Sequence, residues 1–203
     1  MTTNNMIDIT CTITGTTALI CNRFTDEAAL AATSGRRGSS AAQDRGTPRE
    51  MAEKKLYVGL DGRVMIPQPN LMRSIVDGGK FEKVGKAQVT TQSSSMLFSW
   101  VTISGIENGA EIPIQHKDPW RVDQRAVVIP ATKGRILAFR PIFDDWALTF
   151  RLRVDTEGFN TKLMRRIVDH AGKRIGLGDF RPSRKGPYGQ FVVTSWDEQS
   201  AAA

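Results

Sequence analysis

Two segments near opposite ends of the chain alternate strictly between apolar and polar side chains. Residues 7–14, IDITCTIT, place an isoleucine or a cysteine at every second position, and residues 146–154, WALTFRLRV, repeat the pattern with larger side chains. Since successive side chains of a β-strand point to opposite faces, both segments predict strands with one buried face. The other face of the second strand is partly basic, because it carries Arg151 and Arg153.

An amphipathic helix is expected after each alternating segment. Residues 68–80, QPNLMRSIVDGGK, predict a short helix capped by Asn70 and ended by two glycines, and residues 160–176 predict a longer helix capped by Asn160. Further strands or hairpins are expected at residues 57–67, 95–103, 125–143 and 189–196, with a loop at 105–120. This succession predicts an α+β fold: a single ferredoxin-like (RRM-like) domain over residues 1–203, with a βαββαβ core and an extra hairpin.

Residues 25–55 differ in composition from the rest of the chain. They are rich in Ala, Ser, Gly and charged residues, and SGRRGSSAAQDRG offers almost nothing to bury. Short helices are expected at 26–32 and 48–55, but the segment as a whole predicts a mobile, basic insertion within the domain.

Positive charge is concentrated near the C-terminal end. The chain carries 28 Lys and Arg against 21 Asp and Glu, a net charge of +7, and a surplus of this size favours polyanionic partners. Between residues 160 and 190, eight cations accompany only two acids. Contact with nucleic acid and a merely solvated cationic surface are both consistent with this distribution.

The segment GLGDFRPSRKGPYGQF, residues 176–191, combines four glycines with three cations and a tyrosine. Glycine lets a ligand approach the main chain closely, and cations with an aromatic side chain beside such a backbone suit a phosphodiester chain. The alternative is a helix C-cap at Gly176 or Gly178 followed by an ordinary surface loop.

Several function classes lack their motifs. The loop follows a helix and has neither GxGxxG nor GK[ST], so no nucleotide cofactor is expected. No CxxC pair or histidine cluster suggests a metal, and Cys11 continues an alternating strand, so a buried thiol is expected rather than a disulfide. No apolar run is long enough to cross a membrane and the N-terminus does not resemble a signal peptide, so the expected location is the cytoplasm, without a membrane partner.

No catalytic residue is identified. No motif selects Asp26 or Asp44 as a catalytic acid, and an acid at a helix start and an acid in a loop are the better interpretations. Adjacent Asp144 and Asp145 could hold a divalent ion, although neighbouring residues of a strand point to opposite faces and a turn is the better interpretation. A metal-dependent nuclease therefore remains only a minor alternative.

Two motifs resemble the RAMP superfamily, the RRM-like proteins that supply backbone subunits of CRISPR effector complexes. The segment IPQPNLMRSIV is similar to the family's IPGSSLKGALR, and IGLGDFRPSRKGPYGQFVV looks like its C-terminal glycine-rich loop. Residues 25–55 lie where backbone subunits carry a thumb-like insertion. The chain departs from the pattern at Asn70-Leu71 and at Pro187-Tyr188.

The resemblance implies single-stranded RNA held along the sheet face and gripped by the glycine loop and the first helix. It further implies subunits stacked head-to-tail, with other effector subunits as partners. Arg73 would match the helix arginine on the RNA backbone. The loop would be matched by Gly176, Gly178, Arg181, Gly186 and Gly189.

We therefore expect a non-catalytic protein that binds single-stranded nucleic acid, with RNA favoured over DNA. A phage single-stranded DNA-binding or annealing protein and a structural assembly protein are the alternatives. Trp120 with Arg121 and Arg125 could clamp a base, or Trp120 could simply pack on the domain. The full set of candidate contacts is Arg23, Arg36, Arg37, Arg45, Arg73, Lys80, Trp120, Arg121, Arg125, Lys173, Arg174, Gly176, Gly178, Arg181, Arg184, Lys185, Gly186, Tyr188 and Gly189.

Overall fold

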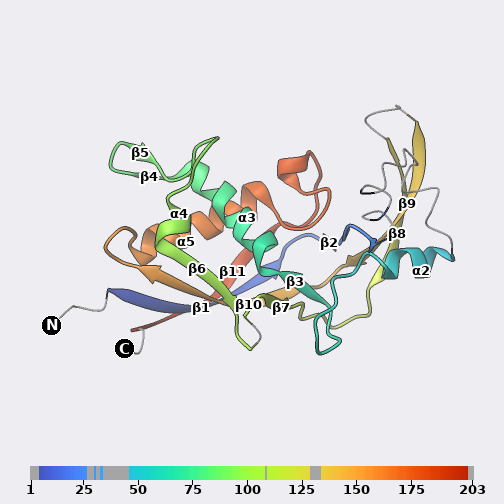
Figure 1. Ribbon diagram of the computed structural model, residues 1–203, viewed down its shortest axis with the longest axis horizontal. Coiled ribbons are helices and arrows are strands. Elements are labelled where there is room, and N and C mark those ends of the chain that lie inside the picture. Colours follow the sequence, from blue (N-terminus) through green and yellow to red (C-terminus); the bar gives the residue numbers. More distant parts are fainter. Residues whose placement is uncertain are drawn as a thin grey trace.

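The computed structural model describes residues 5–26, 30, 33, 46–107, 109–128 and 134–200 (Figure 1). It shows a mixed α/β protein whose paired strands are antiparallel. The main sheet has the order β11-β1-β10-β6, formed by β11 (Phe191–Ser200), β1 (Met6–Gly15), β10 (Ala147–Asp155) and β6 (Val101–Gly105). The two alternating segments of the sequence are thus central neighbours, with Ile9 opposite Leu152.

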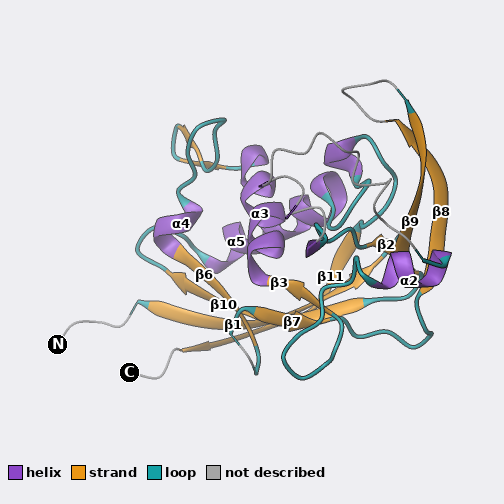
Figure 2. Ribbon diagram, turned by 45° about the vertical axis from the view of Figure 1, so that its right-hand side comes forward, coloured by secondary structure: helices purple, strands orange, loops and turns teal. Residues whose placement is uncertain are grey.

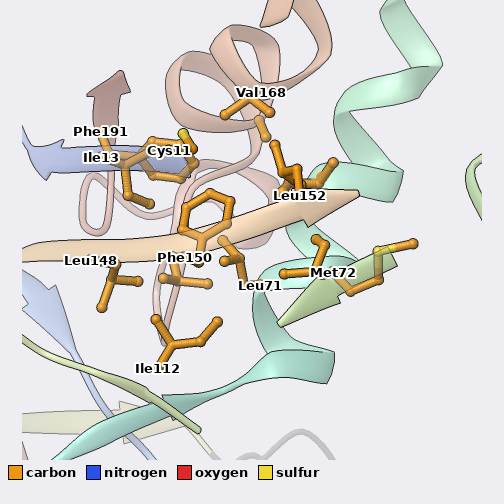
Figure 3. Close-up of a cluster of buried hydrophobic side chains, with 14 of the residues drawn as sticks. Cys11, Ile13, Leu71, Met72, Ile112, Leu148, Phe150, Leu152, Val168 and Phe191 are labelled. Carbon is orange, nitrogen blue, oxygen red and sulfur yellow. The ribbon is translucent and has the colours of Figure 1, made fainter. Parts of the chain in front are cut away.

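Two helices cover one face of this sheet (Figure 2). They are α3 (Gln68–Gly78) and α5 (Thr161–His170), and α5 continues into a π-helical turn, Ala171–Ile175. The apolar side chains of β1 and β10 point toward the helices and form one core with them (Figure 3). The predicted alternation is confirmed, because Ile9, Cys11, Ile13, Leu148, Phe150, Leu152 and Val154 are all buried.

The start of α5 is confirmed and the start of α3 is corrected. The Asn160 side chain accepts a hydrogen bond from the Leu163 amide at 2.7 Å, as an N-cap should. Helix α3 instead begins at Gln68, with Pro67 at the N-cap position, so Asn70 lies inside its first turn. Pro69 explains the difference, because proline has no N–H to lose in the first turn of a helix.

The two glycines that end α3 serve packing rather than a left-handed cap. A Cβ at Gly78 would lie 2.6 Å from the carbonyl oxygen of Ile167, so the residue allows α3 and α5 to approach closely. Gly79 has φ −62, and the chain continues into a 3₁₀-helix, Gly79–Phe81.

A second sheet, in the order β2-β9-β8, projects from the main body (Figure 1). Its long hairpin consists of β8 (Arg121–Val128) and β9 (Arg135–Phe143), and β2 (Leu19–Ile20) joins β9 near the body. Helix α2 (Pro48–Glu53) packs on this hairpin, and its Thr47 and Glu50 form a capping box. The hairpin predicted around Lys133-Gly134 is confirmed, although Lys133 lies outside the described residues.

Shorter elements correct other expectations. Residues 95–103, expected as one strand, begin with a one-turn helix α4 (Leu97–Trp100) before β6. The expected loop at 105–120 contains β7 (Glu111–Pro113), which pairs with β3 (Met65–Pro67). A small hairpin joins β4 (Lys83–Val84) to β5 (Ala87–Gln88).

The expected insertion at 25–55 is described only in part. Its second helix is confirmed as α2, whereas most of residues 26–32, and the cationic stretch at 34–45, lie outside the described residues. Within the described ranges, no helix has both the length and the apolar character needed to cross a membrane. Cys11 and Cys21 are buried free thiols, and burial raises the pKa of each to about 12.

Candidate nucleic-acid interface

The glycine-rich loop, residues 176–190, packs tightly on its own backbone and on β2. The Gly189 amide donates to the carbonyl oxygen of Ala18 at 2.8 Å, and the Leu177 amide donates to Gly189 at 2.8 Å. A Cβ at Gly189 would lie 1.8 Å from the oxygen of Leu177, and one at Gly186 would lie 1.8 Å from the oxygen of Phe180. These close approaches account for the two glycines without any ligand.

The cations of this loop behave differently from its glycines. Arg184 and Lys185 are exposed at the tip of the loop. Arg181 is partly buried and donates to the carbonyl oxygen of Gly178 at 2.8 Å. Loss of water around its guanidinium lowers the pKa of Arg181, and the neighbouring charge of Arg184 lowers it further. In the described part of the chain, no carboxylate forms an ion pair with Arg181.

The loop and α3 enclose a cavity of about 240 Å³, called here the arginine cavity. Helix α3 contributes Asn70 and Arg73, and the loop contributes Arg181 with the backbone of Gly176 and Gly178. The wall is fixed by Ser74, whose hydroxyl donates to the oxygen of Gly176 at 2.8 Å. The helix arginine and three of the five loop residues singled out by the family resemblance therefore meet at one cavity, whereas Gly186 and Gly189 do not line it.

A larger cavity of about 1010 Å³ lies between this loop, α2 and the β8–β9 hairpin. Its lining includes the basic residues Arg23, Arg125 and Arg184 and the rings of Phe24 and Phe180. Asn22 and Asp179 line both cavities and are joined by a 3.0 Å hydrogen bond, so the two hollows are neighbours across this pair. Together they form a surface that carries both cations and aromatic rings.

A buried ion network holds the loop against the hairpin. Arg140 of β9 contacts Asp123 of β8 at 2.7 Å and Asp179 of the loop at 2.8 Å. Arg125 binds the same Asp123 and donates to the Tyr188 hydroxyl at 2.8 Å. These contacts raise the pKa of Arg125, with Asp123 as the main cause. The network therefore fixes two candidate residues, Arg125 in the lining of the large cavity and Tyr188 through its hydrogen bond to Arg125.

Sequence reasoning missed three members of this network, Asp123, Arg140 and Asp179. Asp123 and Arg140 face each other across the β8–β9 hairpin, and Asp179 joins them from the glycine-rich loop, so only the folded chain brings all three together. One local signal existed, because Arg140 interrupts an otherwise apolar stretch, ILAFRPIF. A charge in such a stretch must be paired when the strand is buried.

Other candidates lie away from the cavities. The Trp120 ring is covered by the guanidinium of Arg49, 3.2 Å from the ring centre, which matches the alternative that Trp120 packs on the domain. Arg121 pairs with Asp144 at 2.8 Å and lowers the pKa of that carboxyl. The turn expected at Asp144-Asp145 is confirmed.

The remaining candidates have separate surroundings. Lys80 pairs with Asp77 at 2.7 Å, and Arg174 lies 4.9 Å from the ring centre of Phe81. Lys173 is exposed on the π-helical turn. Arg36, Arg37 and Arg45 lie outside the described residues, as does Asp44.

The open face of the main sheet is polar rather than aromatic. On β1, β6 and β10 it carries mostly hydroxyl side chains, such as Thr12 and Thr149, whose oxygens are 3.1 Å apart. Arg153 forms two hydrogen bonds with Asp8, at 2.7 and 2.8 Å, so its charge is balanced. These three strands offer no ring on this face for a base to stack on.

Comparisons with known proteins add no assignment. The sequence matches no protein-family model and no curated protein. Among the residues that the structure describes, no three His, Cys, Asp or Glu side chains are grouped so that they could hold a metal ion. The functional argument therefore rests on the two cavities and their charges.

Proposed function

We propose that this chain binds single-stranded nucleic acid, with RNA as the preferred strand, and does not cleave it. Copies of the chain would line up head-to-tail along the strand and form the backbone of a ribonucleoprotein complex. The bound strand lies over the arginine cavity and the neighbouring large cavity, rather than along the open face of the sheet.

The position of Arg181 carries this proposal. Among the described residues no carboxylate forms an ion pair with this partly buried guanidinium, so only the more distant charges of Asp77 and Asp179 offset the water that burial removes from it. A phosphate would supply the missing counter-charge through strong, charge-assisted hydrogen bonds. Arg73 on the same cavity and the exposed pair Arg184 and Lys185 extend this positive surface. Phe24 and Phe180 offer rings for sequence-independent stacking of bases.

We also propose that the core is ferredoxin-like, of the RRM-like type. The elements follow one another as β1, α3, β6, β10, α5 and β11. In the sheet the last of these strands lies beside the first, and β10 lies between β1 and β6. This order supports a βαββαβ core, in which the β8–β9 hairpin and the residues between β1 and α3 are insertions.

Titration of labelled oligonucleotides tests the binding proposal. Fluorescence anisotropy should show binding of single-stranded RNA at low ionic strength, with weaker binding of a duplex. The logarithm of the affinity should fall linearly with the logarithm of salt concentration, by about 0.7 for each phosphate contacted. A protein that binds none of these strands at low salt would refute the proposal.

Competition between RNA and DNA of equal length and sequence decides the preferred strand. Preference for RNA would indicate contacts to the 2′-hydroxyl group. Preference for DNA would replace RNA by single-stranded DNA and favour the phage-type alternative.

Exposed apolar side chains on the hairpin support assembly. Val128 is 54% exposed and Leu137 is 50% exposed. Burying such residues against another copy would remove apolar surface from water. Light scattering coupled to size exclusion, with and without a long strand, measures the assembly. Because both residues also line the large cavity, a Val128→Ser/Leu137→Ser variant is compared with the unaltered protein without a strand, where it should assemble less.

A further inference from the structure

An exposed aromatic side chain lies beyond the arginine cavity on the other side of Arg73. Phe98, on the one-turn helix α4, is 65% exposed. It borders two hollows, one of about 330 Å³ and one of about 460 Å³, and Arg73 lines both of them. Because Arg73 also lines the arginine cavity, three hollows meet around this residue of α3.

The two hollows beside Phe98 differ in chemistry. The smaller one is lined by Lys80 and by the hydroxyl-rich loop Thr90–Ser95. The larger one is lined mainly by apolar side chains, including Pro69, Met72 and Ile103. The ring of Phe98 thus lies between a polar, cationic hollow and an apolar one.

The polar hollow is built on a fixed turn. The Thr91 amide donates to the oxygen of Ser94 at 2.8 Å, and the Ser94 amide donates to the Thr91 hydroxyl at 3.1 Å. Beneath it, Asp77 bridges two cations, with Lys80 at 2.7 Å and Arg73 at 3.3 Å. One carboxylate is thus shared by two cations, which leaves positive charge for an anion.

We propose that Phe98, Arg73 and Lys80 form a second nucleotide subsite, which rests on the function proposed above. A base of the bound strand stacks on Phe98 over the apolar hollow, and its phosphate contacts Lys80 and the hydroxyls of the 90–95 turn. The strand therefore crosses α3 from the glycine loop toward α4. A base with its phosphate requires apolar and cationic surroundings side by side, and an apolar peptide segment would use only the larger hollow.

A series of single-stranded oligonucleotides of increasing length, from about four to about sixteen nucleotides, tests this subsite. Phe98→Ala should leave the affinity for the shortest bound strand unchanged and should reduce the affinity for long strands at least about fivefold. A fivefold loss is the lower end of the contribution that one stacked base makes to affinity. Lys80→Gln should reduce the slope of log affinity against log salt concentration by about 0.7 for long strands, because one phosphate contact is lost. Phe81→Ala is the matched control, because this ring is 45% exposed and lines neither hollow.

The outcomes separate this subsite from the function on which it rests. If the unaltered protein binds no strand, the proposed function fails. If it binds and Phe98→Ala changes no affinity at any length, the strand does not reach α4 and the subsite is refuted. Equal losses for short and long strands, or a change in oligomeric state without a change in protomer affinity, would also refute it. The second of these results would instead indicate a contact between copies.

Discussion

The sharpest test of the interface compares two pairs of cations. Arg184→Gln/Lys185→Asn removes the exposed charges of the glycine loop, and Arg151→Gln/Arg153→Gln removes those of the open sheet face. Both changes lower the net charge equally, so long-range attraction falls by the same amount in each variant. Asparagine is chosen at Lys185 because this residue has φ +62, a left-handed conformation that asparagine tolerates.

The size of the effect follows from counterion release. For a single strand, each lost phosphate contact reduces the slope of log affinity against log salt concentration by about 0.7. The loop variant loses two such contacts, so its slope should be smaller by about 1.4. The unaltered protein binds more tightly than the loop variant at low salt. When the salt concentration is raised fourfold, the ratio of the two affinities should therefore shrink about sevenfold. The sheet variant should keep the slope of the unaltered protein, because Arg153 is already paired with Asp8.

Anisotropy titrations of one labelled strand over a range of salt concentrations measure these slopes, and thermal unfolding checks that both variants are folded. Equal changes of slope in the two variants would show that the loop has no special part in binding. A loss confined to the sheet variant would place the strand on the open face of the sheet and refute the interface argued above.

Three further predictions concern stability. Gly189→Ala should destabilise the protein in urea by about 3 kcal/mol or more, because the new Cβ would meet the Leu177 oxygen at 1.8 Å. Gly85→Ala, whose new Cβ would have nothing within 4 Å, should cost only about 1–2 kcal/mol. Equal losses would contradict the close packing of the loop. Arg140→Met should cost about 1–3 kcal/mol, because Asp123 would keep Arg125 but lose its buried arginine partner and Asp179 would lose its ion pair. Arg135→Met on the exposed end of β9 should change stability by less than about 0.5 kcal/mol. The Arg166 guanidinium holds the pKa of Glu82 below its ordinary value, so the pair stabilises the folded state above that ordinary value and this contribution is lost as the pH falls through the lowered pKa. Glu82→Gln should therefore reduce the loss of stability on acidification, and an unchanged pH profile would argue against the pair.

The central part of the fold could be predicted because its signals are local. Alternation over 7–14 and 146–154 marks β1 and β10, and the Asn160 cap with its apolar stripe marks α5. The strand predicted over residues 95–103 was wrong at its start, because the short, mostly apolar stretch LFSW suits a strand or a helix equally. Only packing decides that it forms one helical turn. The pairing of β2 with β9 was not predictable, since two residues carry too little pattern.

The candidate site was predictable in composition but not in geometry. The sequence showed that glycines and cations share one loop, and suggested that both serve the ligand. The structure separates the two, because Gly186 and Gly189 permit close backbone packing while Arg184 and Lys185 remain exposed. The ion network around Arg140 joins opposite residues of the β8–β9 hairpin to Asp179 of the loop, and no local pattern specifies the contact with the loop.

The position of β1 has a consequence for how the protein is made. Both neighbours of this strand come from much later in the chain, and the earlier of them, β10, begins only at Ala147. During synthesis β1 therefore lacks both neighbouring strands until most of the polypeptide has emerged from the ribosome, and its apolar side stays uncovered by them. Folding dominated by such distant pairings is slow, so the nascent chain should depend on chaperones, and truncation before residue 147 should leave it prone to aggregation.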